Sequence, residues 1–299
     1  MAVPAISKYL QPEVLTKISN LQLVAQLVVE GFLTGLHKSP FHGFSVEFSQ
    51  HRAYNPGDSL RFIDWKVLAR TDRYYIKQFE EETNLRSYLL LDVSRSMRFG
   101  SGQISKAQYS HYLAAAIVYL LMLQRDATGL VLFDQQIKKI LPPRSVFSYL
   151  SVLLQAIESV EYGPDTDVGQ ALHAIADRFR RRGLIILISD LLDTPENILS
   201  GLKHFRHDNH EVLVFHIVDP QEKAFDYSGE VIFKDLESGQ QIKTHPGYIR
   251  NQYRELFQRF QKRFQLECSN HRIGYKMLTT DTPYHIGLTE FLLKRKRLI

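Results

Sequence analysis

Three separate stretches of the sequence place carboxylates and hydroxyls in a pattern that suits a divalent cation. Asp92, Ser94 and Ser96 stand at alternate positions directly after an apolar run, and Asp190 follows a second apolar run. Thr166 lies in a loop ahead of a helical pattern. Mg²⁺, Mn²⁺ and Ca²⁺ all prefer such oxygen ligands. We therefore predict a metal site formed by these five residues, with magnesium as the best-fitting ion because it prefers six oxygens and retains water molecules.

Each of these stretches also has an ordinary structural explanation. Asp and Ser directly after a strand often serve as turn residues or helix caps. Asp165 and Asp167 suit the first turn and the cap of the helix that follows them. The combination favours a metal site, because the carboxyl ends of adjacent parallel strands meet at one edge of a sheet.

Apolar strand patterns alternate with helical patterns from residue 86 onward. Strands are expected over residues 88–91, 129–133, 184–188, 212–218 and 275–278, and over 136–141, where Pro142 and Pro143 would end the strand. Helices are expected over residues 106–124, 146–160, 167–181, 195–205, 248–270 and 287–296, and a hairpin over 231–243. This alternation predicts an α/β fold with a doubly wound, mostly parallel sheet that is covered on both faces.

The first 85 residues have a different character. Residues 13–36 predict one amphipathic helix, with apolar residues at steps of three or four. Strands are expected over residues 45–48 and 74–79, with a turn at Pro56-Gly57 and a helix cap at Asp58. Trp65 lies in the charged segment 47–70, where it suits either a core anchor or a partner surface. We therefore expect an appendage over residues 1–85 and an α/β domain over 86–299.

The composition limits the class of protein. A single cysteine, Cys268, excludes an internal disulfide and is typical of a reducing compartment. The longest charge-free apolar run, residues 112–123, is shorter than the roughly 20 residues of a membrane-spanning helix, and no secretory signal is visible. The formal net charge of +5 is small for 299 residues. We expect a cytoplasmic protein that has no membrane span and binds no nucleic acid.

Two families share motifs with this sequence. The set Asp92, Ser94, Ser96, Thr166 and Asp190 resembles the metal-ion-dependent adhesion site of von Willebrand factor A-like domains. The stretches Arg-Ala-Tyr-Asn-Pro-Gly-Asp over 52–58 and Arg-Phe-Ile-Asp-Trp-Lys over 61–66 resemble the signature of the domain-of-unknown-function 58 family, whose members join this stretch to an A-type domain. The resemblance, which covers roughly residues 41–280, implies a six-stranded sheet with a short antiparallel edge strand, for which 136–141 is the candidate. It also implies that the protein works with a MoxR-type AAA+ ATPase.

The predicted function is that of a non-enzymatic interaction module. If Asp92 and Asp190 contact the ion largely through water, its direct ligands are neutral hydroxyls and it remains strongly electrophilic. It would then bind an acidic side chain of a MoxR-type ATPase or of that ATPase's substrate, in assembly or metal insertion. The alternative is a metal-dependent hydrolase or phosphatase that uses the same ion. A dehalogenase-type phosphatase would need an acid where Ser94 stands, and the sequence has no Gly-x-Ser-x-Gly or Walker motif.

Two further groups of residues suit either a site or an ordinary structural role. His204, His207 and His210 recur every three residues, but a helix that ends before the strand at 212 would separate them. Arg178, Arg180, Arg181 and Arg182 would suit phosphate, but in the last turn of a helix they also complement its dipole. We expect a structural role for both groups.

Overall fold

The computed structural model describes residues 11–16, 18–37, 51–53, 75–77, 86–163, 167–234 and 240–296. The chain divides into two compact units, one formed by Met1–Gly35 with Leu85–Ile299 and the other by Leu36–Asn84. In the smaller unit, strand β1 (His51–Ala53) pairs antiparallel with β2 (Tyr75–Lys77), within the strand expected over 74–79. The expected strand over 45–48, the turn at 56–57, the cap at Asp58 and the side chain of Trp65 lie outside the described residues.

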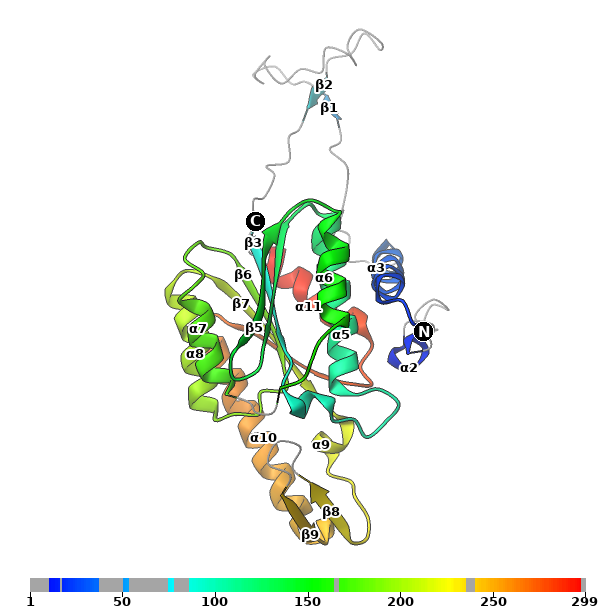
Figure 1. The fold of residues 1–299 in the computed structure, drawn as a ribbon, viewed down its shortest axis with the longest axis vertical. Helices are drawn as coiled ribbons and strands as arrows, with labels where there is room; N and C mark the ends of the chain where they lie inside the picture. The colour runs from blue at the N-terminus through cyan, green and yellow to red at the C-terminus, as the bar shows by residue number, and fades with distance from the viewer. Residues whose placement is uncertain are drawn as a thin grey trace. The chain divides into compact units, whose positions relative to one another are not determined.

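The larger unit is built on a six-stranded sheet (Figure 1). Its strands are β3 (Arg86–Asp92), β4 (Ala127–Phe133), β5 (Ile137–Arg144), β6 (Leu184–Ser189), β7 (Glu211–Val218) and β10 (Gly274–Thr279). Their spatial order is β10-β7-β6-β3-β4-β5, and all neighbouring pairs are parallel except β4 and β5. The predicted six-stranded, mostly parallel sheet with one antiparallel edge strand is confirmed.

Helices cover both faces of this sheet (Figure 1). One face carries α5 (Lys106–Leu123), α6 (Tyr149–Glu158) and α11 (Tyr284–Lys296). The other carries α7 (Val168–Ala176), α8 (Pro195–His207) and part of α10 (Pro246–Asn270), whose buried Phe264 and Cys268 join one apolar core with β6. Strands β3 and β6 are buried almost throughout, which explains their nearly continuous apolar sequence.

The edge strand β5 is longer than its sequence predicts. Pro142 and Pro143 were expected to end it, but the strand continues through them to Arg144. Both prolines lie at an edge strand where the register with β4 shifts between Thr128 and Leu130, and such an irregularity tolerates residues that lack an N–H. Gly129 of β4 lies opposite, and a Cβ there would approach the carbonyl oxygen of Leu141 to 2.8 Å. A glycine at this position therefore permits the close approach of the two strands.

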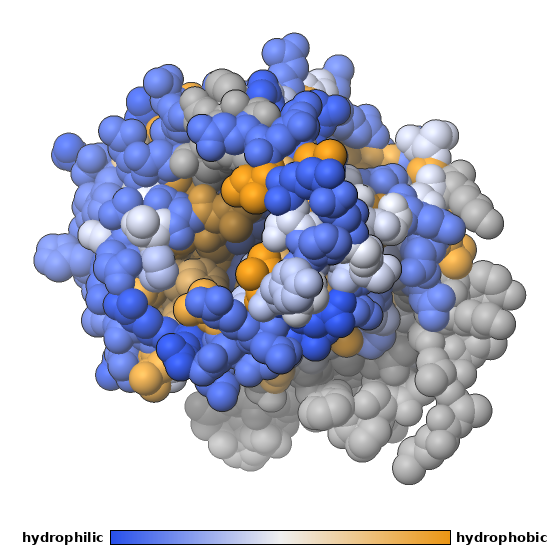
Figure 2. Space-filling view, turned by 90° about the horizontal axis from the view of Figure 1, so that it is seen from below, coloured by the Kyte–Doolittle hydropathy of each residue, from blue (hydrophilic) through white to orange (hydrophobic). Residues whose placement is uncertain are grey.

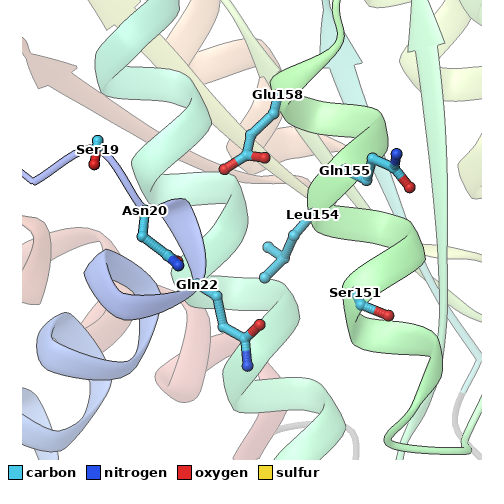
Figure 3. A pocket seen from close by; sticks show the side chains of 7 residues that line it. All are labelled: Ser19, Asn20, Gln22, Ser151, Leu154, Gln155 and Glu158. Carbon is cyan, nitrogen blue, oxygen red and sulfur yellow. The ribbon is translucent and has the colours of Figure 1, made fainter.

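The N-terminal helix predicted over 13–36 is instead two helices, α2 (Pro12–Leu15) and α3 (Leu21–His37). The chain breaks at Asn20, whose Oδ1 accepts a hydrogen bond from the N–H of Leu23 and so caps α3. The N–H of Leu21 donates to Glu158 at the end of α6, beside a polar recess of about 380 Å³ (Figure 3). The appendage expected over residues 1–85 includes these N-terminal helices. The larger compact unit instead contains residues 1–35 together with the α/β sheet.

Helix α7 is shorter than predicted and ends at Ala176. Beyond it, Phe179 is buried and stacks on Tyr88, and its carbonyl oxygen lies 2.7 Å from Nε2 of His210. These contacts turn the chain toward the core. Arg178, Arg180, Arg181 and Arg182 therefore lie beyond the helix and not in its last turn, which corrects the helix end expected at 181.

A small substructure follows β7 at the carboxyl edge of the sheet. Helix α9 (Pro220–Ala224) leads to the hairpin of β8 (Val231–Lys234) and β9 (Gln241–Thr244), and α10 follows (Figure 1). The hairpin was predicted, but α9 was not. In the part of the chain that the structure describes, no helix has both the length and the apolar character needed to cross a membrane.

Candidate functional site

The sheet topology brings two of the predicted ligands together. Strands β3 and β6 are parallel neighbours, so Asp92 at the end of β3 lies beside the residues that follow β6, including Asp190. Ser94 and Ser96 lie in the next turn, where a short 3₁₀ helix spans Arg95–Arg98. Thr166 lies outside the described residues.

Asp92 is buried and held by its neighbours. Its Oδ1 accepts a hydrogen bond of 2.9 Å from the N–H of Ser94, and its Oδ2 accepts one of 2.5 Å from the hydroxyl of Ser189. Burial and the nearby Asp190 raise the pKa of Asp92 well above its ordinary value, although these hydrogen bonds oppose the shift. A cation beside this carboxylate would therefore be strongly favoured.

The two serine hydroxyls lie together in the same turn. The Oγ atoms of Ser94 and Ser96 are 3.0 Å apart, and both residues are buried. Ser94 also forms a bridge with Gly163, whose N–H donates to the carbonyl oxygen of Val93. A Cβ on Gly163 would overlap the carboxylate of Asp134, so any larger residue here would require that buried side chain or the loop to move. Paired hydroxyl oxygens of this kind are suitable neutral ligands for magnesium.

Asp190 sits in a strained turn. The next residue, Leu191, is buried and has a φ of 55°, a left-handed conformation that is unfavourable for any L-residue with a Cβ atom. Its N–H donates to Ser189, and the N–H of Leu192 donates to Oδ1 of Asp190 at 3.3 Å. The turn thus fixes the carboxylate of Asp190 at the edge of the sheet.

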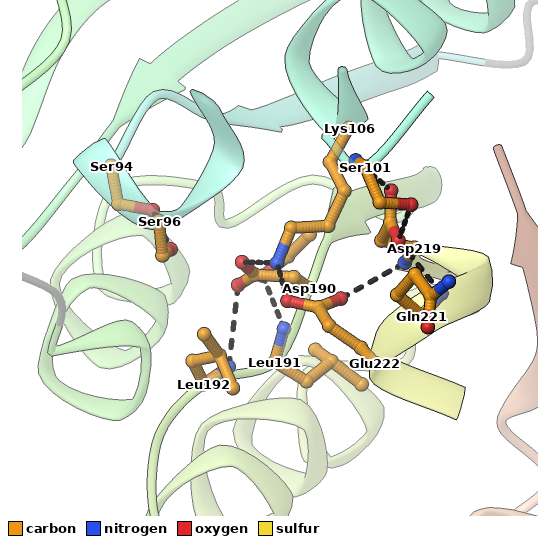
Figure 4. Close-up of polar contacts among 11 residues, drawn as sticks. Ser94, Ser96, Ser101, Lys106, Asp190, Leu191, Leu192, Asp219, Gln221 and Glu222 are labelled. Carbon is orange, nitrogen blue, oxygen red and sulfur yellow. Dashed lines mark hydrogen bonds and ion pairs between the residues drawn. The ribbon is translucent and has the colours of Figure 1, made fainter. Parts of the chain in front are cut away.

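The structure adds a residue that sequence reasoning missed. Lys106, the first residue of α5, is fully buried, and its Nζ lies 2.8 Å from Oδ2 of Asp190 and 2.7 Å from Oε1 of Glu222 (Figure 4). Although burial lowers the pKa of Lys106, the two carboxylates outweigh it and raise the pKa above its ordinary value. A lysine in the first turn of a helix interacts unfavourably with the helix dipole. This position is the sequence feature that could have indicated a buried carboxylate partner for Lys106.

Glu222 is itself held by the start of α9. Its Oε2 accepts a hydrogen bond of 2.9 Å from the N–H of Asp219, and Asp219 caps the same helix in a capping box. Asp219 also accepts hydrogen bonds from the backbone and the hydroxyl of Ser101. Burial raises the pKa of Glu222, and Lys106 opposes that shift.

The donor set fits a hard divalent cation. When all four groups are ionised, Asp92, Asp190, Glu222 and Lys106 together carry a net charge of −2, which one Mg²⁺ would neutralise. Nowhere in the described residues are three or more His, Cys, Asp or Glu side chains placed to hold a metal. Any ion here would therefore depend on hydroxyls and water as well as on carboxylates, as the sequence predicts.

The histidines expected to have a structural role lie apart. Helix α8 ends at His207, and His210 is buried against Phe179. Nδ1 of His204 lies 3.1 Å from Nδ1 of His173, which is on α7. These positions agree with the expectation that the three histidines do not form one site.

A hollow with an apolar floor and a polar rim opens at the carboxyl edge of the sheet (Figure 2). A cavity of about 330 Å³ lies beside the candidate site, and it is lined by Asp190, Lys106, Glu222, Asp193 and His216 together with Leu191, Leu192, Val218, Tyr253, Phe257 and Phe260. Burial lowers the pKa of His216 to about 4, so that its imidazole is neutral at pH 7. The carboxylate of Asp190 thus has the candidate metal site on one side and an apolar cavity on the other.

Comparison with known proteins finds relatives for most of the chain. The uncharacterized proteins Mb1516 of Mycobacterium bovis and Rv1480 of Mycobacterium tuberculosis are each 29% identical over 231 residues, which is 76% of this chain and 72% of theirs. Among solved structures, the conserved hypothetical protein BatB from Bacteroides thetaiotaomicron is 18% identical over 71% of this chain and 99% of its own, with a TM-score of 0.48. The SpRpn10 VWA domain is 12% identical over 69% of this chain and 93% of its own, with a TM-score of 0.41.

A family model described as "Protein of unknown function DUF58" matches residues 50–263. This range is well over half of the chain. It includes strands β1 and β2 of the smaller unit and every residue of the candidate metal site. The chain therefore belongs to the DUF58 family.

Proposed function

We propose that this protein is a non-enzymatic interaction module that binds a divalent ion and, through it, an acidic side chain of a partner protein. The observation that carries this proposal is the placement of Asp92 and Asp190 at adjacent strand ends, both buried, next to the paired hydroxyls of Ser94 and Ser96. Thr166 would supply a third hydroxyl. Gly163, three residues before Thr166, docks against Ser94 and supports this assignment.

The chemistry of the donor set favours partner binding over metal storage. Both oxygens of Asp92 already accept hydrogen bonds from the protein, and Asp190 is paired with Lys106. Neither carboxylate is therefore free to neutralise an ion alone. Magnesium bound mainly to neutral hydroxyls and water retains a strong attraction for an incoming carboxylate, which would form a charge-assisted bond.

The partner we propose is a MoxR-type AAA+ ATPase or its substrate, in assembly or metal insertion. This assignment rests on the resemblance of the chain to DUF58 proteins. A metal-dependent phosphatase is the alternative, but Ser94 occupies the position where a dehalogenase-type enzyme would need its acid. We therefore favour a module without turnover.

The test is binding of a purified MoxR-type ATPase to this protein, with Mg²⁺ and with a chelator. We expect chelator and Asp92→Asn each to weaken binding at least about tenfold, or 1.4 kcal/mol. Thr166→Ala should weaken partner binding more than magnesium binding. Asp208→Asn, at the half-buried C-cap of α8, is the matched control and should change neither. The proposal would be overturned if neither chelator nor Asp92→Asn weakened binding of the ATPase. Mg²⁺-dependent phosphoester hydrolysis that Asp92→Asn abolishes would also overturn it.

A further inference from the structure

We propose that Lys106 is a built-in competitor of the metal ion, because its ammonium binds the same carboxylate, Asp190, that the ion requires. This inference rests on the metal site proposed above and concerns how tightly that site binds. Lys106 would keep the affinity for magnesium low, so that the ion is held firmly only when a partner's carboxylate is also present.

The first observation is that the ammonium of Lys106 is buried in direct contact with Asp190. The side chain of Lys106 is 1% exposed and that of Asp190 is 2% exposed, so water does not screen their contact of 2.8 Å. A positive charge at this distance makes Asp190 a weaker ligand for a second cation. Magnesium must therefore displace the ammonium or share the carboxylate with it.

The second observation is that Glu222 offers the ammonium another partner. Glu222 contacts Lys106 at 2.7 Å through Oε1, while its Oε2 remains bound to the N–H of Asp219. Because the capping box fixes Glu222 independently of Lys106, the ammonium keeps one carboxylate when the ion takes its place beside Asp190. Lys106 thus has a defined place in both the metal-free and the metal-bound protein.

A third observation links the competition to the surface. Glu222 lies on α9, and the same cavity that Lys106, Asp190 and Glu222 line is bounded by Tyr253 and Phe257 of α10. A movement of the Lys106 ammonium from one carboxylate toward the other would take place at the wall of this cavity. The competition between Lys106 and the ion therefore takes place at the surface of the protein and not deep in its core.

The experiment measures magnesium affinity by isothermal titration calorimetry and thermal unfolding, with Mg²⁺ alone as the probe. Lys106→Met should bind magnesium at least about tenfold more tightly than wild type, or 1.4 kcal/mol. Lys106→Arg should restore the wild-type affinity because it keeps the charge. Lys276→Met removes an equivalent charge from the Lys276–Glu290 pair on β10 and α11, and it should change nothing.

Glu222→Gln supplies a second, independent measurement in case Lys106→Met does not fold. Without Glu222 the ammonium has Asp190 as its remaining carboxylate in the cluster, so magnesium binding should weaken, by about threefold or more. Equal or weaker magnesium binding by folded Lys106→Met, or unchanged binding by Glu222→Gln, would overturn the competition while leaving the metal site in place. Absence of magnesium binding in wild type and in every variant would overturn the metal site as well.

Discussion

The hydroxyl of Ser189 donates a 2.5 Å hydrogen bond to Asp92, joining the ends of two adjacent strands through their side chains. Ser189 also accepts a hydrogen bond from the N–H of Leu191, so its own orientation is fixed by the turn that follows β6. Asp92 is therefore held in place by the protein itself. A site held in this way needs little rearrangement to accept a ligand.

The first prediction concerns Asp92→Asn. Wild type should gain stability in millimolar Mg²⁺, by about 2.7 kcal/mol at a hundred times Kd, because the ion binds only the folded state. The variant should lose most of that gain. Without magnesium it should be at least as stable as wild type, because burial and Asp190 already disfavour the charge on Asp92. Thermal unfolding with and without Mg²⁺ measures both effects, and a full magnesium response in the variant would rule out this site.

The second prediction concerns Gly163→Ala. The added methyl group overlaps the carboxylate of the buried Asp134, so either that carboxylate leaves its contacts with Gln136 and Lys138 or the loop that bridges to Ser94 shifts. We expect a loss of about 1–3 kcal/mol in the free energy of unfolding, measured in urea, together with a smaller magnesium response. Gly102→Ala is the control, because a Cβ at Gly102 meets no atom within 4 Å. Equal stability of the two variants would contradict the close approach at Gly163.

The third prediction concerns pH. Burial lowers the pKa of His111 to about 4 from an unfolded value near 6.5, so the unfolded chain takes up a proton there before the folded one does. This contribution to stability is complete above pH 6.5 and is lost as the pH falls toward 4. His111→Gln removes it, so wild type should lose about 2 kcal/mol relative to this variant between pH 7.5 and pH 5.

The comparison with a variant is necessary because the raised pKa of Asp92 acts in the opposite direction over the same range. Urea unfolding of both proteins at each pH gives the difference. His207→Gln, at a residue whose side chain is 88% exposed, serves as the control and should follow wild type. If the free energies of unfolding of wild type and His111→Gln differed by the same amount at every pH in this range, His111 would not titrate as a buried group.

The fourth prediction concerns the buried ion pair of Arg295 on α11 with Asp126, at 2.8 Å. Arg295→Met removes this ion pair from the buried carboxylate of Asp126, which should cost about 3–5 kcal/mol. The double variant Asp126→Leu/Arg295→Met should recover most of that loss, because no buried charge remains. Urea unfolding measures both, and losses that simply add would exclude a pairwise role for these residues.

The sheet could be predicted from the sequence because its four central strands, β3, β4, β6 and β7, are buried on both faces and therefore appear as short, continuous apolar runs. The placement of Asp92 and Asp190 at its carboxyl edge follows directly from the parallel order of β3 and β6. The start of α5 also follows from local chemistry, because the hydroxyl of Ser105 accepts a hydrogen bond from the N–H of Gln108 and so caps the helix.

The ionic partner of Asp190 could not be predicted in the same way. Lys106 is 84 positions away from Asp190 and 116 from Glu222, and no periodicity in the sequence relates them. Their contact depends on how α5 and α9 both meet the edge of the sheet. The early end of α7 has a similar origin, because the burial of Phe179 against Tyr88 overrides a helical pattern that continues past it.

The two prolines of β5 have a consequence for how other proteins can bind. A partner that adds a strand to an exposed sheet edge depends on an unbroken row of backbone N–H donors. Pro142 and Pro143 interrupt that row, so β5 is protected against strand addition and against edge-to-edge aggregation. Recognition by backbone pairing is therefore blocked along this stretch of the sheet edge, which leaves β10 as the edge of this sheet without such a barrier.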